Sequence, residues 1–159
     1  MRVIDASSAL FAWDTYPPDQ FPRLWDWLAL QIESGDLTTA QVALMEIGHI
    51  TPECARWLKA RRIVEHPTGQ AVADEGARIK ALLGIVDDDF GTGVDANDLL
   101  IVATARLLRA SLISDEAPQL VLPNSMRKYK IPAVTRMPLV QVDCRNFVDY
   151  VKQSRAVFG

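Results

Sequence analysis

The chain has 159 residues, of which 49% are hydrophobic and 23% are charged, so we expect one globular domain over residues 1–159 and exclude fibrous and disordered classes. A net charge of −3 lacks the overall basic character of most nucleic-acid-binding proteins, although carboxylates that hold metal ions would themselves lower the charge. No apolar run is long enough to span a bilayer and no secretory leader is evident, so we expect no membrane contact. Cys54 and Cys144 form neither a disulfide framework nor a zinc motif, which favours a reducing, cytoplasmic location.

Strand and helix patterns alternate through the first half of the chain. The β-branched residues at 2–5 predict a buried strand, after which Ser7 and Ser8 offer caps for a helix. Apolar residues at helical spacing predict a helix from Phe21 that ends at Gly35. The next predicted elements are a strand at 37–40, helices at 41–50 and 53–60, and a strand at 62–65.

The same alternation continues in the second half. The clearest element is a helix over 95–109, because its apolar residues recur with helical spacing. The other predicted elements are a helix at 68–83, a polar loop at 87–93, strands at 111–114 and 139–142, and a last helix at 145–152. Alternating strands and helices predict an α/β fold with three layers, in which helices cover both faces of a central parallel sheet.

Four carboxylates stand where such a sheet binds ligands. Asp5 and Asp115 follow predicted strands directly, while Glu46 and Asp98 lie on helices that come after strands. Ligands of open parallel sheets bind beyond the carboxyl ends of the strands, so we expect these four acids to meet there. Mg²⁺ or Mn²⁺ would relieve their mutual repulsion, and two such ions can activate a water molecule and stabilise the leaving oxygen of a phosphodiester.

Each acid also has a simpler interpretation. Asp5 and Asp115 fit turn or cap positions at the ends of strands. Asp98, together with Asp95, fits the negatively charged first turn of a helix, and Glu46 fits a solvated surface position. Residue types and spacing alone therefore leave open whether the acids form one site.

Four segments resemble the motifs of PIN domains. Residues 3–10 are similar to the opening strand that delivers the first Asp, and residues 98–105 resemble an Asp-led helix rich in alanine. Residues 112–115 resemble the strand before the last acid, and residues 42–46 the helix that carries the Glu. The segments at 16–18, 25–27 and 130–132 further resemble an uncharacterised bacterial branch of PIN-like proteins.

The resemblance implies a single PIN-like nuclease domain of the VapC toxin type. Such a protein would be a metal-dependent endoribonuclease that uses Mg²⁺ or Mn²⁺ and cuts an RNA substrate. It would act as the toxin of a toxin–antitoxin pair, form a homodimer and bind a small antitoxin protein. The implied catalytic and metal-binding residues are Asp5, Glu46, Asp98 and Asp115; Ser7 and Ser114 would orient the carboxylates, and Glu116 and Asp95 are substitute ligands.

Two other functions are compatible with the same sequence. One is a non-catalytic module that keeps the PIN fold and binds RNA or protein. The other is a structure-specific DNA nuclease, against which the lack of helical-arch or DNA-wrapping insertions weighs. A neighbouring antitoxin gene would discriminate best between a toxin and a binding module, and a metal-dependent cleavage assay on mixed RNAs, with Asp5→Asn as its control, would show whether the chain is active.

Overall fold

A five-stranded sheet forms the centre of the computed structural model, which describes residues 1–159. The strands are β1 (Arg2–Ile4), β2 (Leu37–Ala40), β3 (Glu65–His66), β4 (Ser111–Ile113) and β5 (Cys144–Arg145). All neighbouring strands are parallel, and their spatial order is β3-β2-β1-β4-β5. The order reverses between β1 and β4, so the two strands that precede Asp5 and Ser114 flank the switch point where sheets of this kind bind ligands.

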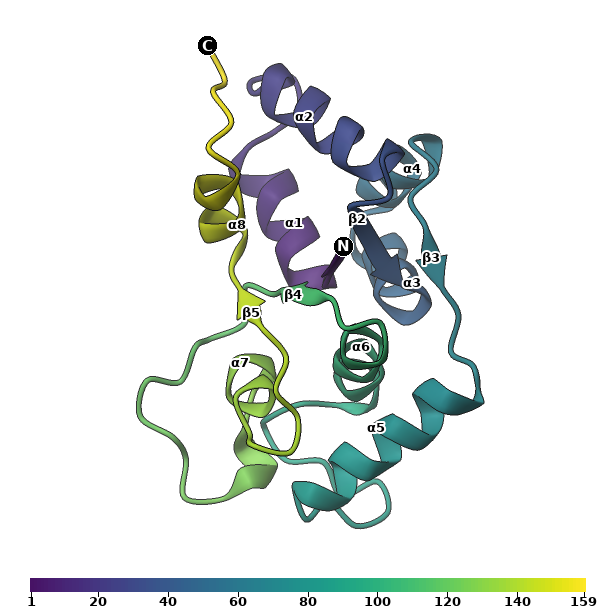
Figure 1. Ribbon diagram of the computed structural model, residues 1–159, viewed down its shortest axis with the longest axis vertical. Helices are drawn as coiled ribbons and strands as arrows, with labels where there is room; N and C mark the ends of the chain where they lie inside the picture. The colour runs from purple at the N-terminus through teal and green to yellow at the C-terminus, as the bar shows by residue number, and fades with distance from the viewer.

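Helices cover both faces of the sheet, which confirms the predicted three-layer α/β/α architecture. The helices are α1 (Ala6–Thr15), α2 (Pro22–Glu33), α3 (Gln41–Ile50), α4 (Pro52–Ala60), α5 (Gln70–Leu82), α6 (Ala96–Leu107), α7 (Ile131–Thr135) and α8 (Phe147–Ser154), with a short 3-10 turn η1 (Met126–Lys128). In Figure 1, α1, α2 and α8 lie on one side of the sheet and α5, α6 and α7 on the other. None of these helices combines the length and apolar character needed to cross a bilayer.

The central strands and α6 form the middle of the core. Val3 of β1 and Leu112 of β4 are completely buried, as expected for parallel strands covered on both faces. Helix α6 packs against both of these strands and contributes the buried residues Ile101 and Val102. Burying one such side chain contributes about 1.5–3 kcal/mol, so the helix that carries Asp98 is held firmly against the sheet.

Several predicted bounds need correction. The first helix begins at Ala6 with Asp5 as its N-cap, so Ser7 and Ser8 lie inside its first turn instead of capping it. The strand predicted at 139–142 is wrong, because Gln141 has a φ of 52°, which breaks an extended segment, and the last strand is Cys144–Arg145. The strand predicted at 62–65 shrinks to Glu65–His66, since Arg62 likewise has a positive φ.

A glycine loop ties the start of α6 to the segment before α7. The backbone N–H of Val94 donates to the carbonyl of Tyr129 at 2.8 Å. A Cβ on Gly93 would lie only 2.4 Å from that same carbonyl oxygen, so no larger residue fits without moving the backbone. The contact fixes where α6 begins, and with it the position of Asp98 in the first turn of that helix.

Candidate active site

Asp5 is the most deeply buried acid at the switch point. It follows β1, and its side chain is 3% exposed. One carboxylate oxygen accepts a hydrogen bond from the backbone N–H of Ala6 at 2.7 Å. The other accepts from the hydroxyls of Ser7 at 2.6 Å and Ser114 at 3.0 Å. Burial raises the pKa of Asp5 despite these hydrogen bonds, so the carboxylate is fixed in place but poorly solvated.

Asp98 enters the same region from the first turn of α6. Its carboxylate accepts a hydrogen bond from the backbone N–H of Asp95 at 2.9 Å, and Asp95 in turn accepts one from the backbone N–H of Asp98 at 2.9 Å. This capping box satisfies two backbone donors of the helix N-terminus. Burial, with the charges of Glu116, Asp95 and Asp5, raises the pKa of Asp98 to about 8. Asp98 therefore both caps its helix and faces other acids.

Glu46 of α3 lies close enough to the other acids for their charges to affect its pKa. It is half-buried, and its pKa is raised by burial and by the charges of Asp5, Asp95 and Glu116. The pKa of Glu116 is raised in turn by burial and by the charges of Asp5 and Asp95. We call Asp5, Glu46, Asp95, Asp98 and Glu116 the acid cluster, because the charges of Asp5, Asp95 and Glu116 raise the pKa values of both Glu46 and Asp98.

Asp115 lies beside Asp5, because its backbone N–H donates to the hydroxyl of Ser7 at 3.0 Å, but its carboxylate has other partners. Its carboxylate accepts hydrogen bonds from the hydroxyl of Ser8 and from the backbone N–H of Phe147, the first residue of α8, at 3.0 Å. It thus joins α1 to α8, and its charge is not among those that raise the pKa values of the cluster. The next acid, Glu116, accepts a hydrogen bond from the backbone N–H of Ile131 at 3.0 Å, and whether Asp115 or Glu116 is the fourth ligand stays a prediction.

No cation of the protein neutralises these carboxylates. None of the five acids forms an ion pair, although seven ion pairs occur elsewhere in the chain. Lys130 lies close enough to lower the pKa of Glu116, but burial and neighbouring acids outweigh it. Oxygen donors of this kind fit Mg²⁺ or Mn²⁺. No three of the side chains are close enough together to hold one ion directly, but Mg²⁺ commonly binds through one or two carboxylates and keeps several waters.

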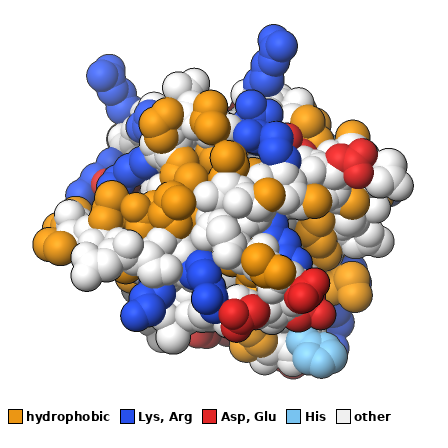
Figure 2. Space-filling view, turned by 90° about the horizontal axis from the view of Figure 1, so that it is seen from below, with side chains coloured by type: hydrophobic (Ala, Val, Ile, Leu, Met, Phe, Trp, Pro, Cys, Tyr) orange, Lys and Arg blue, Asp and Glu red, His pale blue; other side chains and the backbone are white.

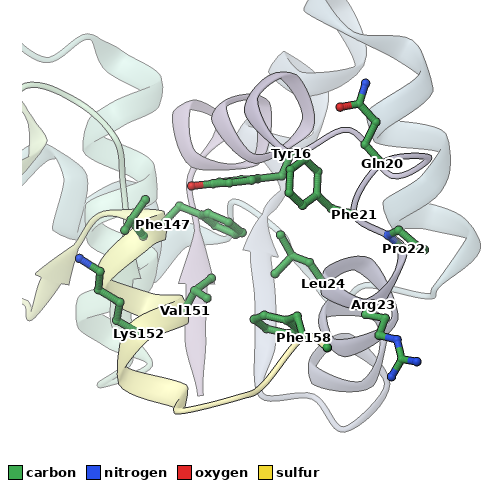
Figure 3. A pocket seen from close by; sticks show the side chains of 12 residues that line it. Tyr16, Gln20, Phe21, Pro22, Arg23, Leu24, Phe147, Val151, Lys152 and Phe158 are labelled. Atoms are coloured by element: carbon green, nitrogen blue, oxygen red, sulfur yellow. The ribbon is translucent and has the colours of Figure 1, made fainter.

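The pocket in Figure 3 lies away from the acid cluster. It measures about 490 Å³ and is formed by the segment between α1 and α2, by α8 and by the C-terminal residues. Figure 3 shows Phe21, Leu24, Phe147 and Phe158 around it, with Arg23 at its edge. No Asp or Glu side chain lines this pocket. The face in Figure 2 carries basic side chains scattered among apolar and acidic ones, without a continuous basic surface.

Comparison with solved structures identifies the class of fold. A chain in the crystal structure of VapBC2 from Rickettsia felis bound to a DNA fragment from their promoter matches with a TM-score of 0.54 and 14% sequence identity. The match covers 92% of this chain and 98% of that chain. Such low identity shows a likeness of fold only, and the fold is the expected three-layer α/β/α PIN-like fold with a parallel sheet.

The chain belongs to the family described as "Domain of unknown function (DUF4411)", whose model matches residues 3–158. That description assigns no activity. A search of curated proteins found no match.

Two features of the site escaped the sequence patterns. Lys130 belongs to the segment at 130–132 that resembles PIN-like proteins, but its approach to Glu116 follows from α7, which the sequence did not predict. Ser8 was interpreted as a helix cap, whereas its hydroxyl holds Asp115. A signal for Ser8 exists in hindsight, because a completely buried hydroxyl inside a helix needs a partner.

Proposed function

We propose that the protein is a metal-dependent endoribonuclease that uses Mg²⁺ or Mn²⁺ and whose catalytic centre is the acid cluster. One observation carries the proposal: carboxylates from four separate segments share one electrostatic field at the switch point of a PIN-like sheet, with no cation paired to them. A fold that only needed stability would pair or separate such charges, because buried unpaired carboxylates are costly.

The residues have different roles in this proposal. Asp5 and Asp98 are the primary ligands, since both are largely buried and both are fixed by hydrogen bonds to backbone or hydroxyl groups. Ser7 and Ser114 orient Asp5, as hydrogen-bonded neighbours of metal ligands do. Glu46 and Glu116 complete the set, with Glu116 in the place first expected for Asp115. A bound divalent ion supplies positive charge and lowers the pKa of a bound water.

A toxin–antitoxin role extends this proposal. It rests on the likeness of fold to VapBC2 and on the motif resemblance, and it implies a homodimer and a small antitoxin partner. An Arg or Lys of such a partner, inserted into the acid cluster, would replace the charge of the metal and block the site. Co-expression with adjacent genes tests this role, and failure to obtain either a complex or rescue of growth would contradict it.

The enzyme proposal is tested by cleavage of mixed RNAs in Mn²⁺, Mg²⁺ or EDTA. Wild type should cleave only with metal, and Asp5→Asn should abolish cleavage because it removes a charged ligand without changing shape. Asp26→Asn on the exposed surface of α2 is the matched control and should retain full activity. RNA binding without cleavage would favour a non-catalytic module, and cleavage restricted to branched DNA would favour a DNA nuclease.

A further inference from the structure

A groove beside the acid cluster is lined by both acidic and apolar side chains. It lies between α3 and the N-terminal end of α6, measures about 350 Å³, and includes Glu46 and Asp95 in its lining. Its lining also includes Met45, His49 and Ile50 of α3 and Asn97 of α6. The groove is therefore continuous with the acid cluster but is not itself made only of carboxylates.

The exposed apolar residues of the groove are unusual for a surface. The side chains of Met45 and Ile50 are 66% and 60% exposed, although both stand on the same helix as the half-buried Glu46. Isolated exposed apolar residues need no explanation, but these two line one cavity together with an imidazole. A thioether, a branched aliphatic chain and an imidazole present the polarizable flat and apolar surface on which an unstacked ring can rest.

The charges of the groove decide which part of a nucleic acid would enter it. No Lys or Arg lines the groove to bind a phosphate, and Glu46 and Asp95 would repel one that lies there without a metal ion. A nucleobase carries no charge, so the same carboxylates do not repel it. Asn97 is exposed at the end of the groove and offers one carbonyl acceptor and two amide donors, which match the hydrogen-bonding edge of a base.

We propose that the groove between α3 and α6 binds one unpaired nucleobase of the substrate strand, next to the phosphate that the acid cluster acts on. The inference rests on the proposed function and adds to it the class of substrate. A base can enter the groove only when it is unstacked and unpaired, so the substrate is single-stranded at that position. Met45, His49 and Ile50 provide the contact surface, and Asn97 contacts the edge of the base.

The test measures binding separately from cleavage. A fluorescein-labelled single-stranded RNA is titrated with protein in Ca²⁺, affinity is read by fluorescence anisotropy, and a gel shows whether the RNA is intact. Met45→Ala should weaken binding by up to about tenfold, which is the upper end of what one contact between a thioether sulfur and an aromatic ring contributes. The matched control is Leu30→Ala, because Leu30 is 60% exposed on α2 and lies outside the groove. This control should bind like wild type.

A second RNA series identifies the base itself. Single abasic positions are moved along the strand, and at one position the abasic RNA should bind wild type as weakly as intact RNA binds Met45→Ala. The two losses should not add at that position, since both remove the same contact. Equal affinity of Met45→Ala and wild type, or additive losses at every position, would overturn the groove proposal while metal-dependent cleavage still stood. Absence of both RNA binding and cleavage by wild type would instead overturn the proposed function.

Discussion

Glu75 and Asp98 are two carboxylates whose surroundings shift their pKa values in opposite directions. Glu75 of α5 is a buried acid that accepts two hydrogen bonds from Arg78, at 2.6 and 2.9 Å, and lies 3.2 Å from a guanidinium nitrogen of Arg106. Its hydrogen bonds with Arg78 lower its pKa. Asp98 is also partly buried, but its neighbours are acids and its pKa is raised to about 8. The same chemical group is thus stabilised at one place and destabilised at the other.

The difference separates a structural carboxylate from a candidate functional one. Arg78 also donates to the carbonyl of Leu139, and Arg106 donates to the carbonyl of Val140, so the Glu75 network ties two helices to the loop before β5. The acid cluster ties nothing together by ion pairs. The chain has 17 Lys and Arg residues, so the lack of pairing reflects where they are placed and not a shortage of cations. A cation from outside the protein would complete the cluster.

The largest effect is expected for Glu116, which is compared with Asp115, the other acid that follows β4. Glu116→Gln should lower kcat/KM for RNA cleavage by about a hundredfold or more, because it removes a charged oxygen from the cluster. Asp115→Asn should lower it by less than about tenfold, since an amide oxygen can still accept from Ser8 and Phe147. Both are measured as initial rates in Mn²⁺. The reverse ranking would restore Asp115 as the fourth acid of the site.

The second effect concerns metal and stability. Mn²⁺ at a hundredfold excess over its dissociation constant should raise the free energy of unfolding of wild type by about 2.7 kcal/mol. Asp98→Asn should respond much less, because it lacks one ligand. Glu75→Gln should respond like wild type, since Glu75 has its own cations. Thermal melts with EDTA and with Mn²⁺ measure these responses, and identical responses of all three proteins would show that the acids do not act together.

The sequence predicted the parts of the fold that local patterns determine. Helix α3 and strand β2 have the predicted bounds, and α3 ends before Pro52, which disfavours a helical conformation at Thr51. The segment between β4 and β5 was not predictable in this way. Helix α7 is only five residues long, and the positive φ of Gln141 depends on packing that no local pattern reveals.

The site shows the same division between local and distant causes. Motif and position grouped Asp5, Glu46 and Asp98, and the charge of Asp5 is among the causes that raise the pKa of Glu46 and of Asp98; that the three form one site stays a prediction. The choice between Asp115 and Glu116 depended on partners far away in sequence. The backbone N–H of Phe147 holds the first acid and that of Ile131 holds the second, so the order of residues alone could not decide.

The third effect is expected at the paired site. Glu75→Gln should lower the free energy of unfolding by about 1.5–3 kcal/mol, because hydrogen bonds to a charged group are lost and two guanidinium groups keep no counterion. The control is Glu53→Gln, whose pair with Arg56 at 3.1 Å is exposed on α4, and its effect should stay within about 0.5 kcal/mol. Denaturant unfolding measures both. A Glu75→Gln variant as stable as wild type would remove the contrast between the two sites.

The two sites should also give opposite dependences of stability on pH. Glu75 has a lowered pKa when folded, so its contribution is present above the unfolded pKa and is lost as pH falls. Asp98 has a raised pKa, so the folded chain keeps a proton that the unfolded chain releases between about pH 4 and pH 8. Its contribution to stability therefore falls as pH rises through that window and then levels off.

The smallest effect is expected for Asp98→Asn without metal, and it measures how much the charge of Asp98 changes the free energy of unfolding. In EDTA at pH 8 the free energy of unfolding of the variant should be about 1 kcal/mol higher than that of wild type. The reason is that an uncharged side chain avoids burial of charge beside Asp5 and Glu116. The gain is limited, since a carboxylate in the first turn of α6 interacts favourably with the helix N-terminus by about 0.3–1 kcal/mol. At pH 5, where Asp98 is protonated in the folded wild type, the difference should disappear or reverse. Melts of both proteins in EDTA between pH 5 and pH 8 measure the slope. A variant less stable than wild type across the whole range would mean that Asp98 is only a helix cap.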